Sequence, residues 1–140
     1  MARIYLLDTN IVSEIIKLDP NPLVLEKIKT YASYSAISSV TWSELWYGVN
    51  LLPKSKKKSH IEKFLIETVQ ALFPIIPMDS HAAFIMGETR AALQKSGIIK
   101  DIQDLQIAST AISNNMILIT RNTRDFEHIP TLMVENWFEG

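Results

Sequence analysis

The chain has no cysteine, so neither a disulfide nor a thiolate metal site is available to it. It has only four glycines among 140 residues, and none directly follows the first apolar segment. This excludes the glycine-rich loop that a Rossmann-type nucleotide site requires. No apolar run approaches the ~18 residues of a membrane span, and no basic-then-apolar leader opens the sequence. We therefore expect a cytoplasmic protein with no membrane anchor.

The chain also has no excess of positive charge. Lysine and arginine number 14 and aspartate and glutamate 15, so the net charge is −1. The chain thus lacks the broad basic field of a typical nucleic-acid binder, and any nucleic acid would have to be held by a local patch, a metal or a multimer. With 47% hydrophobic residues the chain is globular, and its length predicts a single domain spanning 1–140.

Short apolar segments alternate with patterns of helical period along the whole chain. We predict strands at 4–7, 35–38, 75–76, 116–120 and 132–134. Helices are predicted at 10–17, 22–32, 40–51, 61–72, 80–96 and 101–113. Alternating strands and helices imply right-handed crossovers. The fold class that follows is α/β, a three-layer α/β/α sandwich around a mostly parallel sheet.

Acidic residues recur where these elements meet the carboxyl edge of the sheet, which is where open α/β sheets bind ligands. Asp8 directly follows the first strand, and Glu44 is expected in the first turn of the helix after the second. Asp104 is expected in the first turn of the helix before the strand at 116–120. Asn122 and Asp125 follow that strand. Four separate segments could therefore bring oxygen ligands to one point.

Crowded carboxylates repel one another and need a cation. Oxygen ligands of this kind suit Mg²⁺ or Mn²⁺, ions that polarise phosphates and activate water. Each acid also has a structural explanation. Asp8 could cap a helix, Thr41 and Glu44 fit a capping box, Asp104 could complement a helix dipole, and Asp125 lies in a turn. The joint pattern favours the metal site.

Four motifs in this order resemble those of the PIN-domain nucleases and cover nearly the whole chain. They are Leu7-Asp8-Thr9-Asn10, Ser39 to Leu45 with Gly48, Asp104 to Ala108, and Ile119 to Phe126 with Ile129-Pro130. The sequence is most similar to the VapC toxins of bacterial and archaeal toxin–antitoxin pairs. The resemblance implies a PIN-like fold and a Mg²⁺- or Mn²⁺-dependent endoribonuclease toxin that is neutralised by a cognate antitoxin. Transfer RNA is then the expected target and ribosomal RNA the alternative.

The resemblance also assigns roles to residues. Asp8, Glu44 and Asp104 match the metal-holding acids of the family, and the products would carry a 5′ phosphate and a 3′ hydroxyl. Many relatives have an acid where this chain has Asn122, and Asp125 is the alternative for that fourth catalytic position. Asp101 is treated as peripheral. The family also implies a homodimer.

Substrate contacts are predicted from charge and position. Arg121 and Arg124 flank the site loop and are the first choice for phosphate contacts, with Asn10 beside them. The basic run at 54–58 is either an RNA or partner surface or a solvated helix start. All three histidines are expected at the surface, which leaves no histidine for metal-free cleavage. The rival hypothesis is an inactive PIN-like module that binds RNA or protein, which the Asn122 departure favours.

Overall fold

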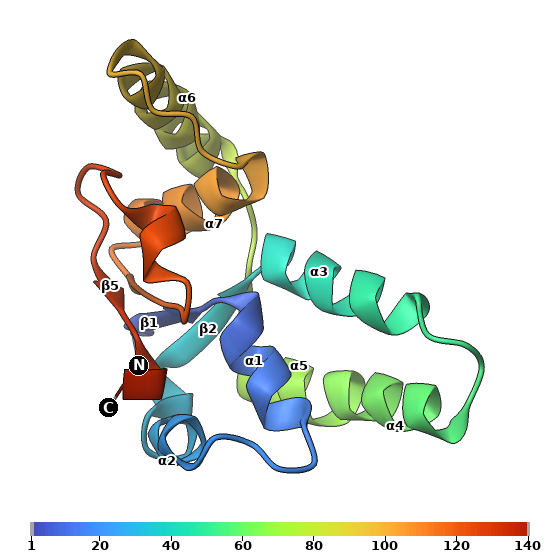
Figure 1. Cartoon of the computed structure of the whole chain (residues 1–140). Helices are drawn as coiled ribbons and strands as arrows, with labels where there is room; N and C mark the ends of the chain where they lie inside the picture. The colour runs from blue at the N-terminus through green and yellow to red at the C-terminus, as the bar shows by residue number, and fades with distance from the viewer. Residues whose placement is uncertain (1, 140) are drawn as a thin grey trace.

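Five parallel strands form the single sheet of the computed structural model, which describes residues 2–139 (Figure 1). The strand order across the sheet is β3-β2-β1-β4-β5. Their bounds are β1 (Tyr5–Leu7), β2 (Ser35–Ser38), β3 (Ile75–Ile76), β4 (Ile117–Ile119) and β5 (Val134–Glu135). Every pairing is parallel, where the sequence predicted a mostly parallel sheet.

Helices connect the first four strands as predicted, but the predicted continuous helix at 61–72 is interrupted by a π-helical turn. Their bounds are α1 (Thr9–Ile16), α2 (Pro22–Tyr31), α3 (Ser39–Asn50), α4 (Lys56–Phe64), α5 (Gln70–Leu72), α6 (Ser80–Lys95) and α7 (Ile102–Ser113). A π-helical turn at Leu65–Val69 joins α4 to α5, and short 3₁₀ turns occur at Ala32–Tyr34, Thr123–Phe126 and Trp137–Glu139. None of the helices within residues 2–139 has the length and apolar character needed to cross a bilayer.

Alternation along the strands divides the interior into two apolar cores, one on each face of the sheet. Leu7 contributes to the core under α1, α2, α3 and α4, whereas its neighbour Leu6 contributes to the core under α7. Ile37 and Ala36 divide in the same way on β2. Strands covered on both faces are apolar at every position, which explains the short apolar runs. The three-layer α/β/α prediction is confirmed.

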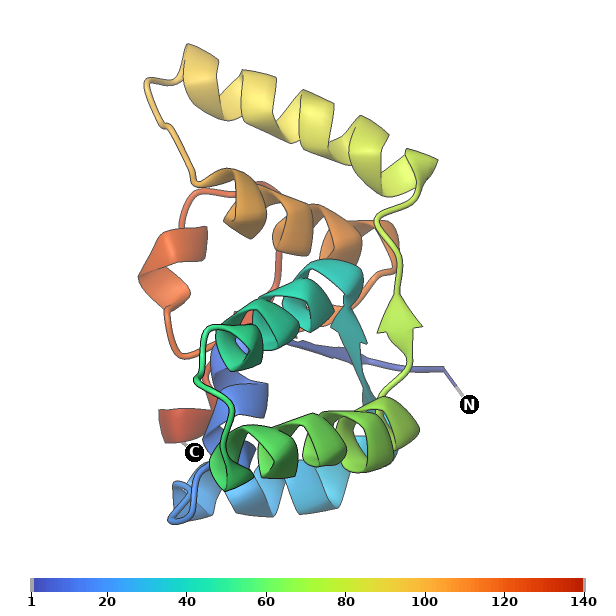
Figure 2. The ribbon, with the colours of Figure 1, turned by 90° about the vertical axis from the view of Figure 1, so that its right-hand side faces the viewer.

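Two helical hairpins extend beyond these layers. α6 packs on α7 and lies on the outer side of that layer, away from the sheet (Figures 1 and 2). α3 and α4 form a second hairpin that projects from the other side of the molecule, and both views show the two helices next to each other. The loop between α3 and α4 therefore lies at an outer end of the molecule.

Two predicted helix starts were wrong, for the same physical reason. α3 begins at Ser39 because Ser38 accepts a hydrogen bond from the Thr41 amide, so the cap is Ser38 and the predicted Thr41–Glu44 capping box does not form. Glu44 consequently lies in the second turn of α3. α4 begins at Lys56 because Ser55 caps it, and the basic run therefore belongs to the helix. In both cases a serine just upstream of the apolar pattern sets the start.

Strand order explains where a site can form. The crossovers from β1 lead first to β2 and β3 on one side, and the chain then returns to place β4 on the other side. Such a reversal leaves a crevice outside the carboxyl ends of the two central strands. In this chain those strands are β1 and β4, which end at Leu7 and Ile119.

Candidate active site

Strand register places three polar residues in one row at this edge. Leu7 of β1 pairs with Ile37 of β2 and with Ile119 of β4. The residue after each of them is therefore level with the other two, and these are Asp8, Ser38 and Thr120. All three are buried. The row is held together by the Asp8 amide, which donates to the Ile119 carbonyl at 2.8 Å.

Three hydrogen-bond donors of the protein orient the Asp8 carboxylate. Asp8 is buried, with only 7% of the residue exposed. One oxygen, Oδ1, accepts from the Thr9 amide at 2.8 Å, which makes Asp8 the N-cap of α1. The other, Oδ2, accepts from the Thr120 hydroxyl at 2.8 Å and from the Asn10 amide at 3.3 Å. Burial raises the pKa of Asp8, and these hydrogen bonds oppose the rise. The capping role and a ligand role are therefore compatible in this residue.

Thr120 and Asn10 connect the end of β4 to the start of α1. The Thr120 hydroxyl oxygen accepts from the Asn10 side chain at 3.2 Å and from the Asn122 amide at 3.1 Å. The Asn10 carbonyl oxygen accepts from the Arg121 amide at 3.0 Å. Both ends of the Asn10 side chain are thus engaged in bracing the site. Its contact with RNA stays a prediction.

Glu44 reaches the same place from α3. The Thr9 hydroxyl donates to Glu44 Oε1 at 2.7 Å, and it lies 3.3 Å from the Thr41 hydroxyl. Thr9 thus links the acid of the second motif to the segment that carries Asp8. Burial raises the pKa of Glu44, and the negative charges of Asp8 and Asp101 raise it further against the opposing bond from Thr9.

Asp104 lies in the first turn of α7, as predicted, and Asp101 is the N-cap of that helix. Burial raises the pKa of Asp104 to about 6, with further contributions from Asp101, Asp125, Asp8 and Glu44. Asp104 therefore feels the charge of four other acids, which come from four different elements. That these acids act together as one site stays a prediction. Asp101 is a larger influence than its peripheral assignment suggested.

The loop after β4 contains both candidates for the fourth position, Asn122 and Asp125. Asp125 is exposed within a 3₁₀ turn, and its charge raises the pKa values of Asp8 and Asp104. Asn122 is attached to the site through its backbone amide, which donates to Thr120. The charge of Asp125 thus acts on two of the predicted acids, whereas the contact of Asn122 with this site is that of its backbone amide with Thr120. Which of the two fills the fourth position stays a prediction.

The two arginines differ in their surroundings. The Arg121 guanidinium lies 4.5 Å from the centre of the Phe138 ring, a cation–π contact with the C-terminal turn. Arg124 is exposed in the turn that contains Asp125. Phosphate contact by either arginine stays a prediction. The histidines His60, His81 and His128 are all exposed, as predicted.

The acids fit a hydrated divalent cation. Within residues 2–139, neither lysine nor arginine forms an ion pair with Asp8, Glu44, Asp104 or Asp125, so hydrogen bonds alone offset part of their mutual repulsion. In the same range no three acidic or histidine side chains are already arranged as direct ligands of one ion. Mg²⁺ commonly binds through one or two carboxylates and keeps several waters. The residues that would hold it are Asp8 and Asp104, with Glu44 completing the set.

Removing the charge of Asp104 should stabilise the metal-free protein. Because its pKa is higher in the folded chain than in the unfolded one, its contribution to stability is present at low pH and is lost as the pH rises through about 6. In EDTA at about pH 7.5, Asp104→Asn is therefore expected to raise the melting temperature by about 2–5 °C, with a smaller gain at about pH 5. Calorimetry of both proteins at the two pH values measures this. An equal or lower melting temperature at the higher pH would contradict the repulsion.

Comparison with known proteins places the chain in a family. A model of the PIN domain matches residues 5–132. Ribonuclease VapC2 of Rickettsia felis is 40% identical over 96% of this chain and 98% of its own length. The tRNA(fMet)-specific endonuclease VapC of Salmonella typhimurium is 31% identical over 95% of this chain and 97% of its own.

A solved structure agrees with the sequence comparison. The crystal structure of VapBC2 from Rickettsia felis, bound to a DNA fragment from their promoter, contains a chain that superposes with a TM-score of 0.82 at 36% identity. The match covers 98% of this chain and 99% of the other. Together with the acids at the carboxyl edge of the sheet, these likenesses show that the chain belongs to the PIN-domain family, among relatives that are VapC ribonucleases.

Proposed function

We propose that the protein is a Mg²⁺- or Mn²⁺-dependent endoribonuclease that acts as the toxin of a toxin–antitoxin pair. The observation that carries the proposal is the placement of the acids at the carboxyl edge of the sheet: Asp8 directly follows β1, and the Thr9 hydroxyl beside it holds Glu44 of α3 at 2.7 Å. Asp104 lies in the first turn of α7, and within residues 2–139 none of these acids forms an ion pair with lysine or arginine. A site of this kind attracts a divalent ion, and the phosphates of RNA can share that ion.

Each side chain has a stated part in the chemistry. A bound divalent ion would supply Lewis-acid polarisation of the scissile phosphate and would lower the pKa of a water. Thr9, Thr120 and Asn10 orient the Asp8 carboxylate by donating hydrogen bonds to it. Thr9 fixes Oε1 of Glu44, which leaves Oε2 to accept a hydrogen bond from the attacking water and to orient it for in-line displacement. The expected products carry a 5′ phosphate and a 3′ hydroxyl.

The substrate and partners follow from the relatives. The Salmonella relative is named for its action on tRNA(fMet), so transfer RNA is the first substrate to test and ribosomal RNA the second. A solved relative from Klebsiella pneumoniae is described as a toxin-antitoxin complex, which supports a cognate antitoxin as the protein partner. A homodimer and a cytoplasmic location complete the proposal. A dimer would double the few basic contacts that a near-neutral chain offers to RNA.

Incubation of the purified protein, freed of any partner, with total cellular RNA tests the proposal. We expect discrete fragments with Mg²⁺ or Mn²⁺, no cleavage in EDTA, and recovery when the metal is restored. End labelling of the fragments should show 5′ phosphates and identify the RNA that is cut. Binding of RNA with no cleavage in either metal would support the inactive binding module instead, with Asn122 as its sequence basis.

A further inference from the structure

The N-terminal part of α4 carries the densest positive charge in the chain. Residues 54–63 contain five of the 14 basic residues and a single glutamate, so this stretch has a charge of +4 and leaves −5 for the rest of the protein. Lys54, Lys56, Lys57 and Lys63 are exposed, and Lys58 is half-buried. We call these five lysines the α4 lysine patch. Charge in this near-neutral chain is therefore strongly segregated.

The stability of α4 does not explain the patch. Lys56, Lys57 and Lys58 occupy the first turn, and no acidic residue is present there. Cations at a helix N-terminus are repelled by the positive end of the helix dipole, so these lysines oppose helix formation. Among the patch lysines, Lys63 alone has an acidic partner within residues 2–139, which is Glu67 at 3.9 Å. The helix dipole and the lysines instead add together to attract an anion.

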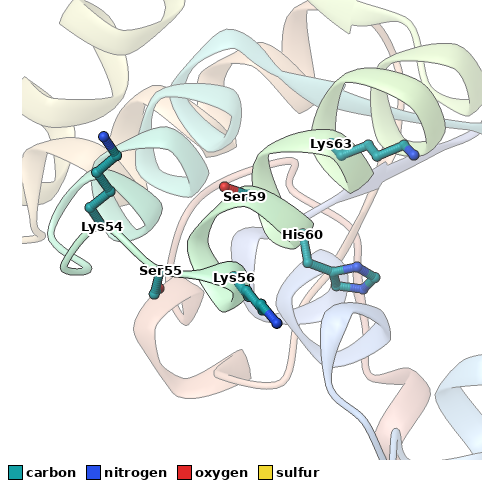
Figure 3. Close-up of a pocket in the computed structure, with 6 residues that line it drawn as sticks. All are labelled: Lys54, Ser55, Lys56, Ser59, His60 and Lys63. Atoms are coloured by element: carbon teal, nitrogen blue, oxygen red, sulfur yellow. The ribbon is translucent and has the colours of Figure 1, made fainter.

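Three of the five patch lysines line a hollow in the protein surface. Figure 3 shows the hollow, of about 500 Å³, which is lined by Lys54, Ser55, Lys56, Ser59, His60 and Lys63. Lys56 and His60 extend from the same side of α4, while Lys54 and Lys63 lie at opposite ends of the group. From Lys56 to Lys63 the helix rises by about 10 Å, a length sufficient to meet more than one phosphate of a nucleic-acid backbone.

The hollow continues toward the acids. Lys56 and His60 also line a second depression, between α1 and α4, which shares Ser13, Lys57 and Ile61 with a third. The third is lined by Thr9 and Glu44, which belong to the candidate active site. A chain that occupies these depressions would therefore run from the patch, past the apolar side chains of Ile16 and Ile61, to Glu44. The acids repel a polyanion locally, so favourable contacts must come from a basic surface of this kind.

We infer that the α4 lysine patch is a docking surface for the phosphate backbone of the RNA substrate, away from the bond that is cut. The inference rests on the proposed ribonuclease function. The contacts are to phosphates, so they add affinity and orientation without reading bases. The patch thus serves long or folded RNA and contributes nothing to a short oligonucleotide that fills only the acidic site.

The test compares two triple variants with the wild type. The patch variant carries Lys54→Gln, Lys56→Gln and Lys63→Gln, and the control carries Lys27→Gln, Lys29→Gln and Lys95→Gln on α2 and α6. Fluorescence anisotropy with labelled transfer RNA in EDTA gives the affinity at about 50–300 mM salt. We expect the patch variant to bind at least tenfold more weakly, with a slope of log affinity against log salt that is smaller by about two. The control should bind like the wild type.

Cleavage separates failure of this inference from failure of the proposed function. With Mg²⁺, the patch variant should cut a short oligonucleotide as fast as the wild type but should show a raised KM for transfer RNA. Unchanged RNA affinity and salt slope in the patch variant, with normal cleavage by the wild type, would overturn the inference and leave an acidic protein partner as the ligand of the patch. If the wild type cuts neither substrate, the proposed function fails, while the change in salt slope still tests the patch.

Discussion

Replacing Asp8 with asparagine is expected to lower the rate of RNA cleavage by about 10²–10³-fold or more, with the fold retained. Asp8 is the most deeply buried acid of the site, and three donors aim its carboxylate. Asparagine is nearly the same size and its carbonyl oxygen can still accept from the Thr9 amide. Asparagine carries no negative charge, however, and its NH₂ group would replace the oxygen that accepts from Thr120 and Asn10, so donors would face a donor.

The measurement is the initial rate of transfer-RNA cleavage in Mg²⁺, with circular dichroism as the check on folding. Asp19→Asn is the matched control, because Asp19 is an exposed acid outside the site. The control should cleave at the wild-type rate. If folded Asp8→Asn keeps more than about a tenth of the wild-type activity, Asp8 is not an essential metal ligand. Capping of α1 would then be a sufficient explanation for an acid at this position.

The largest loss of stability is expected for Trp137→Ala. Trp137 is 2% exposed although it lies only three residues from the end of the chain. The centres of the Trp137 and Tyr5 rings are 5.4 Å apart in an edge-to-face arrangement, and those of the Trp137 and Tyr31 rings are 5.9 Å apart. Trp137 therefore closes the core beneath β1 and α2. Removing a large buried aromatic side chain costs about 3–5 kcal/mol, a large part of the roughly 5–15 kcal/mol that stabilises a typical domain.

Thermal unfolding should show this as a fall in melting temperature of about 10 °C or more. Phe84→Ala on α6 is the control, because its side chain is 63% exposed and its loss should change the melting temperature by only a degree or two. A similarly small change for Trp137→Ala would mean that the C-terminal turn is not part of the folded core.

Local patterns in the sequence were sufficient to place Asp8 at the end of β1 and Asp104 in the first turn of α7. An acid directly after a short apolar strand can be recognised from residue order alone. Because parallel strands present their carboxyl ends at the same edge of a sheet, Asp8 and the loop after β4 could be placed together at that edge. The start of α7 is likewise marked by Asp101 and the apolar residues behind Asp104. These predictions depend on near neighbours and on one topological rule.

The hydroxyl network could not be predicted in this way. Thr9 and Thr120 bond to acids 35 and 112 positions away, so their roles depend on strand register and on the angle of α3. Thr120 does follow a strand directly, which is a signal that could have identified it. The helix starts at Ser39 and Lys56 were missed because the apolar pattern begins downstream of the capping residues Ser38 and Ser55.

One measurement tests most directly the claim that the acids form a cation site: titration of the metal-free protein with Mn²⁺, followed by electron paramagnetic resonance of the free ion. We predict that the wild type and Asp19→Asn remove Mn²⁺ from solution and that Asp8→Asn, while still folded, does so far more weakly. Equal binding by the wild type and Asp8→Asn would contradict the account, because the ion would then be held by residues other than the acids at the end of β1.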